Sequence, residues 1–176
     1  NLAQTAAEQG AAVLNYLKVT GLTKGPDGFV DGVIAEDQEL GRKWEIGAQV
    51  VINAAGPFSD AVRHLAEPDA ERLIAPSQGI HLVFDQSFLP TDAAIMVPHT
   101  SDGRVMFAIP WHGHTLVGTT DTFYDDDPAR VEADGDDVDY ILEAANHAFP
   151  RADVTERDII SMYAGLRPLV APEDEK

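Results

Sequence analysis

The stretch Gln78-Gly79-Ile80-His81-Leu82-Val83-Phe84 indicates what kind of fold to expect. Side chains alternate between the two faces of a strand, so His81 would lie on the face opposite to Ile80 and Leu82. The neighbouring residues extend the same strand to about 73–84. We therefore expect a sheet with one apolar face and one face that carries a histidine.

More strands follow this one. Strand-like segments lie near 93–98, 104–110 and 115–119, and a last apolar strand runs from about 158 to 166. One helix precedes the last strand, because apolar residues keep helical spacing up to Pro150; they are Val138, Ile141, Leu142, Ala145 and Phe149. Strands dominate, so the predicted class is α+β, a mostly antiparallel sheet with flanking helices.

The first 70 residues have a different pattern. A helix is expected over 2–9, and three extended stretches near 12–24, 28–36 and 41–47 are separated by turn residues, which is typical of an antiparallel β-meander. The nearly all-apolar run 49–53 predicts a strand buried on both faces. Ser59 is then the predicted N-cap of a short helix.

Charge and composition exclude several classes. The chain has 176 residues, 12 Lys+Arg, 30 Asp+Glu and a formal charge of −18, which argues against nucleic acid or an anionic membrane surface as a partner. There is no cysteine, and no apolar run approaches the ~20 residues of a membrane span. We see no signal peptide, and the start at Asn1 together with the abrupt end indicates a piece of a longer protein.

Several local motifs resemble functional sites but do not support them. The glycine spacing of 113–120 resembles a phosphate loop but lacks the lysine, and 75–79 is a near miss to a serine-nucleophile motif that continues as a strand. His112-Gly113-His114 is better explained as a hairpin tip than as a metal site. We expect no metal, and no G-x-G-x-x-G motif is present.

Four short blocks carry a resemblance. In chain order they are Val51-Ile52-Asn53-Ala54-Ala55-Gly56-Pro57, Gln78-Gly79-Ile80-His81-Leu82-Val83, Ile109-Pro110-Trp111 with Val117-Gly118-Thr119-Thr120-Asp121, and Tyr163-Ala164-Gly165-Leu166-Arg167-Pro168-Leu169. Their order and spacing resemble the FAD-dependent glycerol-3-phosphate dehydrogenases of the D-amino-acid-oxidase-like flavoprotein family. One departure is Phe58, where that family has tryptophan.

The resemblance implies a FAD site at the turn after the run 49–53. The residues expected to line it are Asn53, Ala54, Ala55, Gly56 and Pro57, whose small side chains let the backbone come close to a flat cofactor. Without the resemblance, the same residues would be read as an ordinary turn between a strand and a helix.

The resemblance also implies a substrate site. It places His81 beside substrate and flavin, where the imidazole would orient the C2 hydroxyl or take its proton; a lone strand histidine is otherwise usually structural. It implies that Arg167 binds the substrate phosphate, a role that suits the forked donors of a guanidinium group. Thr120 is assigned to substrate binding, although we expect a positioning role, not chemistry, for the segment 119–121.

The implied parent enzyme is a FAD-dependent oxidoreductase of glycerol metabolism. It would convert sn-glycerol 3-phosphate to dihydroxyacetone phosphate, pass electrons to a quinone, and be cytoplasmic, at most peripheral on the inner face of the membrane. Residues 1–70 and 161–176 would belong to the FAD domain, which holds the meander, and 71–160 to the substrate domain. We expect the isolated chain to bind no FAD tightly and to be inactive.

Two alternatives stay open. A related flavin-dependent amine or amino-acid oxidase would need its arginine for a carboxylate, and the phrase Gly118-Thr119-Thr120-Asp121 counts against it. A non-catalytic acidic interaction module could have inherited the fold. Acidic residues are absent from 46–59, 72–84, 104–120 and 159–172, which together hold nearly every motif residue, so the charge of −18 describes the surface outside the predicted site.

Overall fold

The computed structural model describes residues 1–100 and 102–171, which form two compact units. The first unit comprises residues 1–71, and the second begins at residue 72. Helices and antiparallel sheets are both present, so the predicted α+β class is confirmed.

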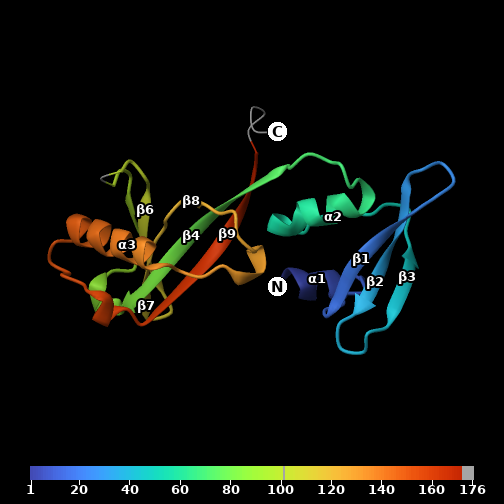
Figure 1. Ribbon diagram of the computed structural model, residues 1–176. Coiled ribbons are helices and arrows are strands. Elements are labelled where there is room, and N and C mark those ends of the chain that lie inside the picture. Colours follow the sequence, from blue (N-terminus) through green and yellow to red (C-terminus); the bar gives the residue numbers. More distant parts are fainter. Residues whose placement is uncertain (101, 172–176) are drawn as a thin grey trace. The chain divides into compact units, whose positions relative to one another are not determined.

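The first unit is built on the predicted meander. Strands β1 (Leu17–Lys24), β2 (Val30–Asp37) and β3 (Lys43–Gly47) pair in this order, each antiparallel to the next (Figure 1). Helix α1 (Leu2–Glu8) precedes them. A 3₁₀ turn, η1 (Gly56–Phe58), leads into α2 (Ser59–Ala66), so Ser59 is the first helical residue and Phe58 takes the N-cap position.

The predicted buried strand at 49–53 is wrong. These residues form no strand, and Val50 and Ile52 are 73% and 83% exposed. An apolar strand needs neighbours on both edges and both faces, and no described residue pairs with this run. Only Gly32 and Ala35 are buried in residues 1–71. The other apolar side chains of this unit are partly or fully exposed.

The second unit is a six-stranded antiparallel sheet centred on β4 (Ile74–Asp85). One edge of β4 pairs with β7 (His114–Gly118) and β8 (Thr122–Phe123), and the other edge pairs with β9 (Ser161–Val170). Beyond β7 follow β6 (Met106–Trp111) and β5 (Ile95–Val97). Figure 1 shows β4 and β9 running side by side.

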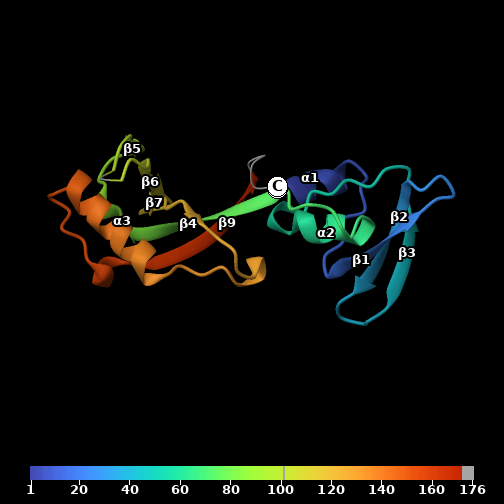
Figure 2. The same ribbon diagram turned by 45° about the horizontal axis from the view of Figure 1, so that its top comes forward.

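Helix α3 (Gly135–Ala148) covers one face of this sheet (Figure 2). Its Ile141 and Ala145 pack in a core with the alternate β4 residues Ile80, Leu82 and Phe84, all at most 1% exposed. The predicted two faces of β4 are therefore confirmed. Short 3₁₀ turns η2 (Gln86–Phe88), η3 (Pro128–Arg130) and η4 (Glu156–Asp158) complete the unit.

Local signals explain where these elements begin and turn. The Asp134 carboxylate accepts a hydrogen bond from the backbone N–H of Asp137 at 2.8 Å and so caps α3. His112 and Gly113 have φ values of 48° and 77°, which fit the two-residue hairpin between β6 and β7.

The last strand starts later than predicted. Residues 156–158 form η4 instead of strand, and β9 pairs with β4 along ten consecutive positions, from Val83–Ser161 to Ile74–Val170. The strand of residues 161–170 thus belongs to the same sheet as the strands between residues 74 and 118. The part of the predicted FAD-domain segment at 172–176 lies outside the described residues. Within the described residues, no helix combines the length and apolarity that crossing a bilayer requires.

Candidate active site

The candidate site lies on the face of the β4 sheet that α3 does not cover. His81 on β4 is directly opposite Tyr163 on β9, and Ser77 is directly opposite Arg167. Directly paired residues on adjacent strands share a face, so His81 and Arg167 lie on the same side of the sheet. The structure thus brings together the two residues to which the sequence assigns chemistry.

His81 is half-buried and stays neutral over a wider pH range than a free histidine. Burial lowers the pKa of the imidazole, and the nearby positive charge of Arg167 lowers this pKa further. Its ring stacks on that of Tyr163, with centroids 5.2 Å apart and planes within 10°. A neutral imidazole can accept a proton, so the environment suits a base.

Arg167 is held in place by the segment that follows β7. Nη2 donates to Thr119 Oγ1 at 2.9 Å and to the carbonyl oxygen of Thr120 at 3.1 Å. Nη1 lies 3.6 Å from the Asp121 carboxylate, which also accepts a hydrogen bond from the buried hydroxyl of Ser77. These contacts orient the guanidinium on the sheet and leave its side chain 37% exposed.

Gly79 leaves the space in which the guanidinium lies. A Cβ atom on Gly79 would collide with Nη2 of Arg167 and would lie 2.6 Å from Nη1 and from Thr119 Oγ1. The φ of Gly79 is not in the left-handed region, so its backbone does not require glycine. The guanidinium of Arg167 approaches the backbone so closely that residue 79 has no room for a side chain.

Thr120 lies inside the protein. It is 0% exposed, and its hydroxyl accepts a hydrogen bond from the backbone N–H of Ile80 at 3.1 Å. Its side chain therefore presents no surface to a ligand in this conformation, while its carbonyl group holds Arg167. The geometry favours the positioning role for Thr120 over direct substrate contact.

The predicted FAD-lining turn belongs to the first unit. The Asn53 side chain shapes this turn, accepting from Ala55 N–H at 3.2 Å and donating to the carbonyl oxygen of Ser59 at 2.9 Å. Gly56 has a φ of +56°, and a Cβ there would meet no atom within 4 Å. The turn is preshaped and its side chains are small, which fits close approach by a flat cofactor.

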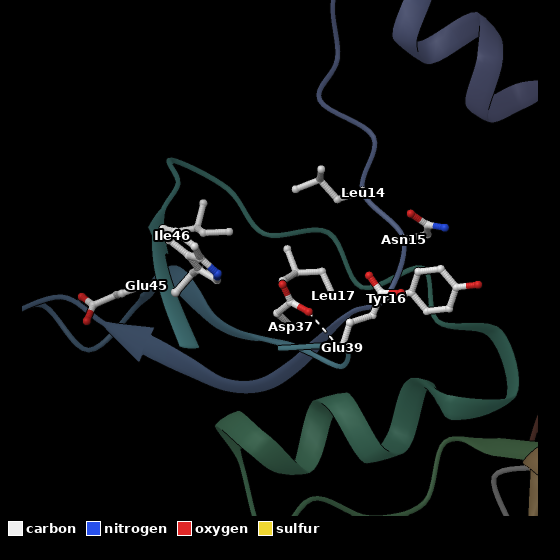
Figure 3. Close-up of a pocket in the computed structure, with 9 residues that line it drawn as sticks. Leu14, Asn15, Tyr16, Leu17, Asp37, Glu39, Glu45 and Ile46 are labelled. Carbon is white, nitrogen blue, oxygen red and sulfur yellow. Dashed lines mark hydrogen bonds between the residues drawn. The ribbon is translucent and has the colours of Figure 1, made fainter. Parts of the chain in front are cut away.

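A different hollow lies in the first unit. This cavity of about 410 Å³ lies beside β1 and β3, and Figure 3 shows its lining, with the Glu39 N–H donating to the Asp37 carboxylate at 2.9 Å. Three carboxylates line it, those of Asp37, Glu39 and Glu45, and no lysine or arginine does. Such a lining repels a phosphate, so the cavity is not a candidate for the phosphorylated ligand.

Sequence reasoning did not assign roles to Ser77, Gly79 or Tyr163. All three lie in or beside the quoted motifs, but their importance comes from strand pairing between β4 and β9. The two-residue periodicity of β4 could have placed Ser77 and Gly79 on the His81 face. Among the described residues, no group of three or more His, Asp or Glu side chains could hold a metal ion.

Comparison with known proteins gives a consistent result. The model of the DAO family, described as FAD dependent oxidoreductase, matches residues 1–176. The aerobic glycerol-3-phosphate dehydrogenase of Staphylococcus haemolyticus is 41% identical over 97% of this chain and 30% of that protein. The mitochondrial glycerol-3-phosphate dehydrogenase of Schizosaccharomyces pombe is 39% identical, over 96% of this chain and 27% of that protein.

A solved structure agrees with these relatives. The glycerol-3-phosphate dehydrogenase from Bacillus halodurans, complexed with FAD, superposes with a TM-score of 0.87 at 44% identity and covers 94% of this chain and 33% of its own. The chain thus spans about a third or less of the length of the relatives it matches. Since the family model matches every residue, the chain belongs to the DAO family of FAD-dependent oxidoreductases.

Proposed function

We propose that the full-length protein oxidises sn-glycerol 3-phosphate to dihydroxyacetone phosphate with FAD and passes the electrons to a quinone. The observation that carries the proposal is the placement of His81 and Arg167 on one face of one sheet, close enough for the charge of Arg167 to lower the pKa of His81. The Staphylococcus and Bacillus relatives, which are named glycerol-3-phosphate dehydrogenases, support the same substrate.

Arg167 binds the phosphate in this proposal. Both N–H groups of Nη2 are engaged by Thr119 and Thr120 at 2.9 and 3.1 Å, whereas Nη1 makes only longer contacts, 3.5 Å to the Ser77 hydroxyl and 3.6 Å to Asp121. Nε has no partner among residues 1–100 and 102–171. The N–H of Nε and the N–H groups of Nη1 are therefore the donors available for phosphate oxygens.

His81 takes the proton of the C2 hydroxyl. Its lowered pKa keeps the imidazole unprotonated at neutral pH, and the face that it shares with Arg167 puts it beside a substrate anchored through its phosphate. As the pH falls through this pKa, the imidazole becomes protonated and can no longer act as a base. The acidic limb of the pH–rate profile would therefore report His81.

The turn of residues 53–57 would lie against FAD. Bound FAD supplies the acceptor for the electrons that leave C2 of the substrate. Residues 1–70 and 161–176 would contribute to the FAD domain and residues 71–160 to the substrate domain. We place the whole protein in the cytoplasm, with at most a peripheral attachment to the inner face of the membrane.

The test is an assay of the full-length protein with glycerol 3-phosphate and an artificial electron acceptor. We expect turnover, and Arg167→Ala should raise KM strongly while His81→Ala should mainly lower kcat. Arg130→Ala is the matched control, because that arginine is 84% exposed and makes only a 3.6 Å contact with Asp127. Turnover of glycine instead of glycerol 3-phosphate would favour the amino-acid oxidase alternative.

A further inference from the structure

The imidazole of His81 has a neighbour on each adjacent strand at the same level of the sheet. On β9 the opposite residue is Tyr163, and on β7 it is Gly118. Directly opposite residues have Cβ positions about 4.5–5.5 Å apart and project to the same face. The ring of His81 therefore stands between the side chain of Tyr163 and the space where a side chain of residue 118 would lie.

Tyr163 fills one side of this arrangement. The two rings are nearly parallel, with an interplanar angle of 10° and centroids 5.2 Å apart, a separation typical of interacting aromatic pairs. The tyrosine is itself 48% exposed, so the core does not require it. Its hydroxyl group has no partner among the described residues, which leaves the ring as the part that makes a defined contact.

Gly118 opens the other side. A Cβ on Gly118 would lie 2.7 Å from Cδ2 of His81 and from the backbone carbonyl oxygen of Ile80, and 3.0 Å from Cγ of His81, closer than ordinary contacts allow. The φ of Gly118 is not in the left-handed region, so its backbone geometry is open to other residues. The imidazole and the Ile80 carbonyl oxygen thus together occupy the volume that a side chain on β7 would otherwise fill.

Within the part of the chain that the structure describes, no hydrogen bond orients the imidazole. Functional histidines are commonly aligned by a partner on one ring nitrogen. Neither ring nitrogen of His81 has a hydrogen-bond partner among residues 1–100 and 102–171. The plane of the ring is therefore set by packing against Tyr163 and Gly118. This packing leaves both ring nitrogens free for a ligand.

We propose that Tyr163 and Gly118 are positioning residues that form a slot for the His81 imidazole and aim its unpaired nitrogens at the substrate. The inference rests on the proposed function, in which His81 accepts the C2 hydroxyl proton. Tyr163 acts through its ring and not through its hydroxyl group. Arg167 is the other charged group that faces His81, and its role stays the separate one of binding the phosphate.

The test uses the full-length, FAD-loaded protein and three variants, Tyr163→Phe, Tyr163→Ala and Gly118→Ala. Since phenylalanine keeps the stack, Tyr163→Phe should retain kcat within ~2-fold. Removing the ring or filling the slot should lower kcat by ~10- to 100-fold and change KM by less than ~3-fold, because the substrate stays anchored while the base is misaligned. Gly47→Ala is the control, because a Cβ there meets no atom within 4 Å.

A second readout does not depend on turnover. Histidine labelled with ¹³C at Cε1, with the His81 signal assigned through His81→Gln, reports the ring directly. Tyr163→Ala should remove the ring-current shift of this signal and raise the pKa of His81 towards its ordinary value, since burial is the main cause that lowers it. Tyr163→Phe should leave both the ring-current shift and the pKa unchanged.

Two results would overturn the slot. One is a Tyr163→Ala protein with unchanged kcat and an unchanged His81 signal. The other is a Tyr163→Phe protein as impaired as Tyr163→Ala, which would assign the function to the hydroxyl group. If Gly118→Ala does not fold, the two Tyr163 variants still decide. A parent protein without glycerol 3-phosphate turnover would refute the proposed function, while the labelled histidine would still test the slot.

Discussion

Replacing Gly79 with alanine should displace the guanidinium of Arg167 and leave the sheet intact. The new Cβ would lie 2.6 Å from both Nη1 of Arg167 and Oγ1 of Thr119, whereas ordinary contacts are 3.4–4 Å. The guanidinium must therefore move by roughly 1 Å, and a misplacement of that size costs about 100-fold in rate. This loss corresponds to about 2.7 kcal/mol of transition-state stabilisation.

The assay is kcat/KM for glycerol 3-phosphate with the full-length protein, together with its thermal unfolding midpoint. Because the displaced atoms are the ends of flexible side chains, the midpoint should change little. Gly47→Ala is the matched control, in a strand and with open space around its Cβ. A Gly79→Ala protein that keeps kcat/KM within about 3-fold of the parent would refute this role of Arg167, since the predicted loss is about 100-fold.

Four further outcomes can be measured. Arg167→Gln removes one of the two causes that depress the pKa of His81, so NMR titration should show this pKa rising towards 6.5. Ile141→Ala leaves a cavity beneath the sheet and should lower the free energy of unfolding by about 2–5 kcal/mol in a urea titration. Asp134→Ala removes the cap of α3 and should cost about 1 kcal/mol by the same measurement. The 176-residue chain purified by itself should show no flavin absorbance band; a bound yellow chromophore would contradict the expectation that it binds no FAD tightly.

Local patterns predicted the parts of the fold that depend on local chemistry. Alternation along β4 placed Ile80 and His81 on opposite faces, and the pair His112-Gly113 marked a hairpin tip, as the structure confirms. Strand-like character at 49–53 was a weaker guide. Burial of such a run depends on neighbours from elsewhere, and no described residue supplies them.

The support around the site could not be predicted in the same way. Ser77 and Arg167 are 90 residues apart in the chain, and their adjacency follows from the register of β4 against β9. The same register puts Tyr163 on His81. A single sequence carries no register information for strands so far apart, so the motifs led to a prediction for His81 and Arg167 but not for the residues that contact them.

The pairing of β9 with β4 also has a consequence for biosynthesis. The ribosome makes β4 long before β9, so one edge of β4 stays unpaired while about 90 further residues are added. An open strand edge is a template for pairing with other chains, and long-range pairing is slow to form. A nascent chain stalled before residue 161 would therefore be prone to aggregation. His81 and the residues that contact Arg167 would acquire their final geometry only when β9 emerges.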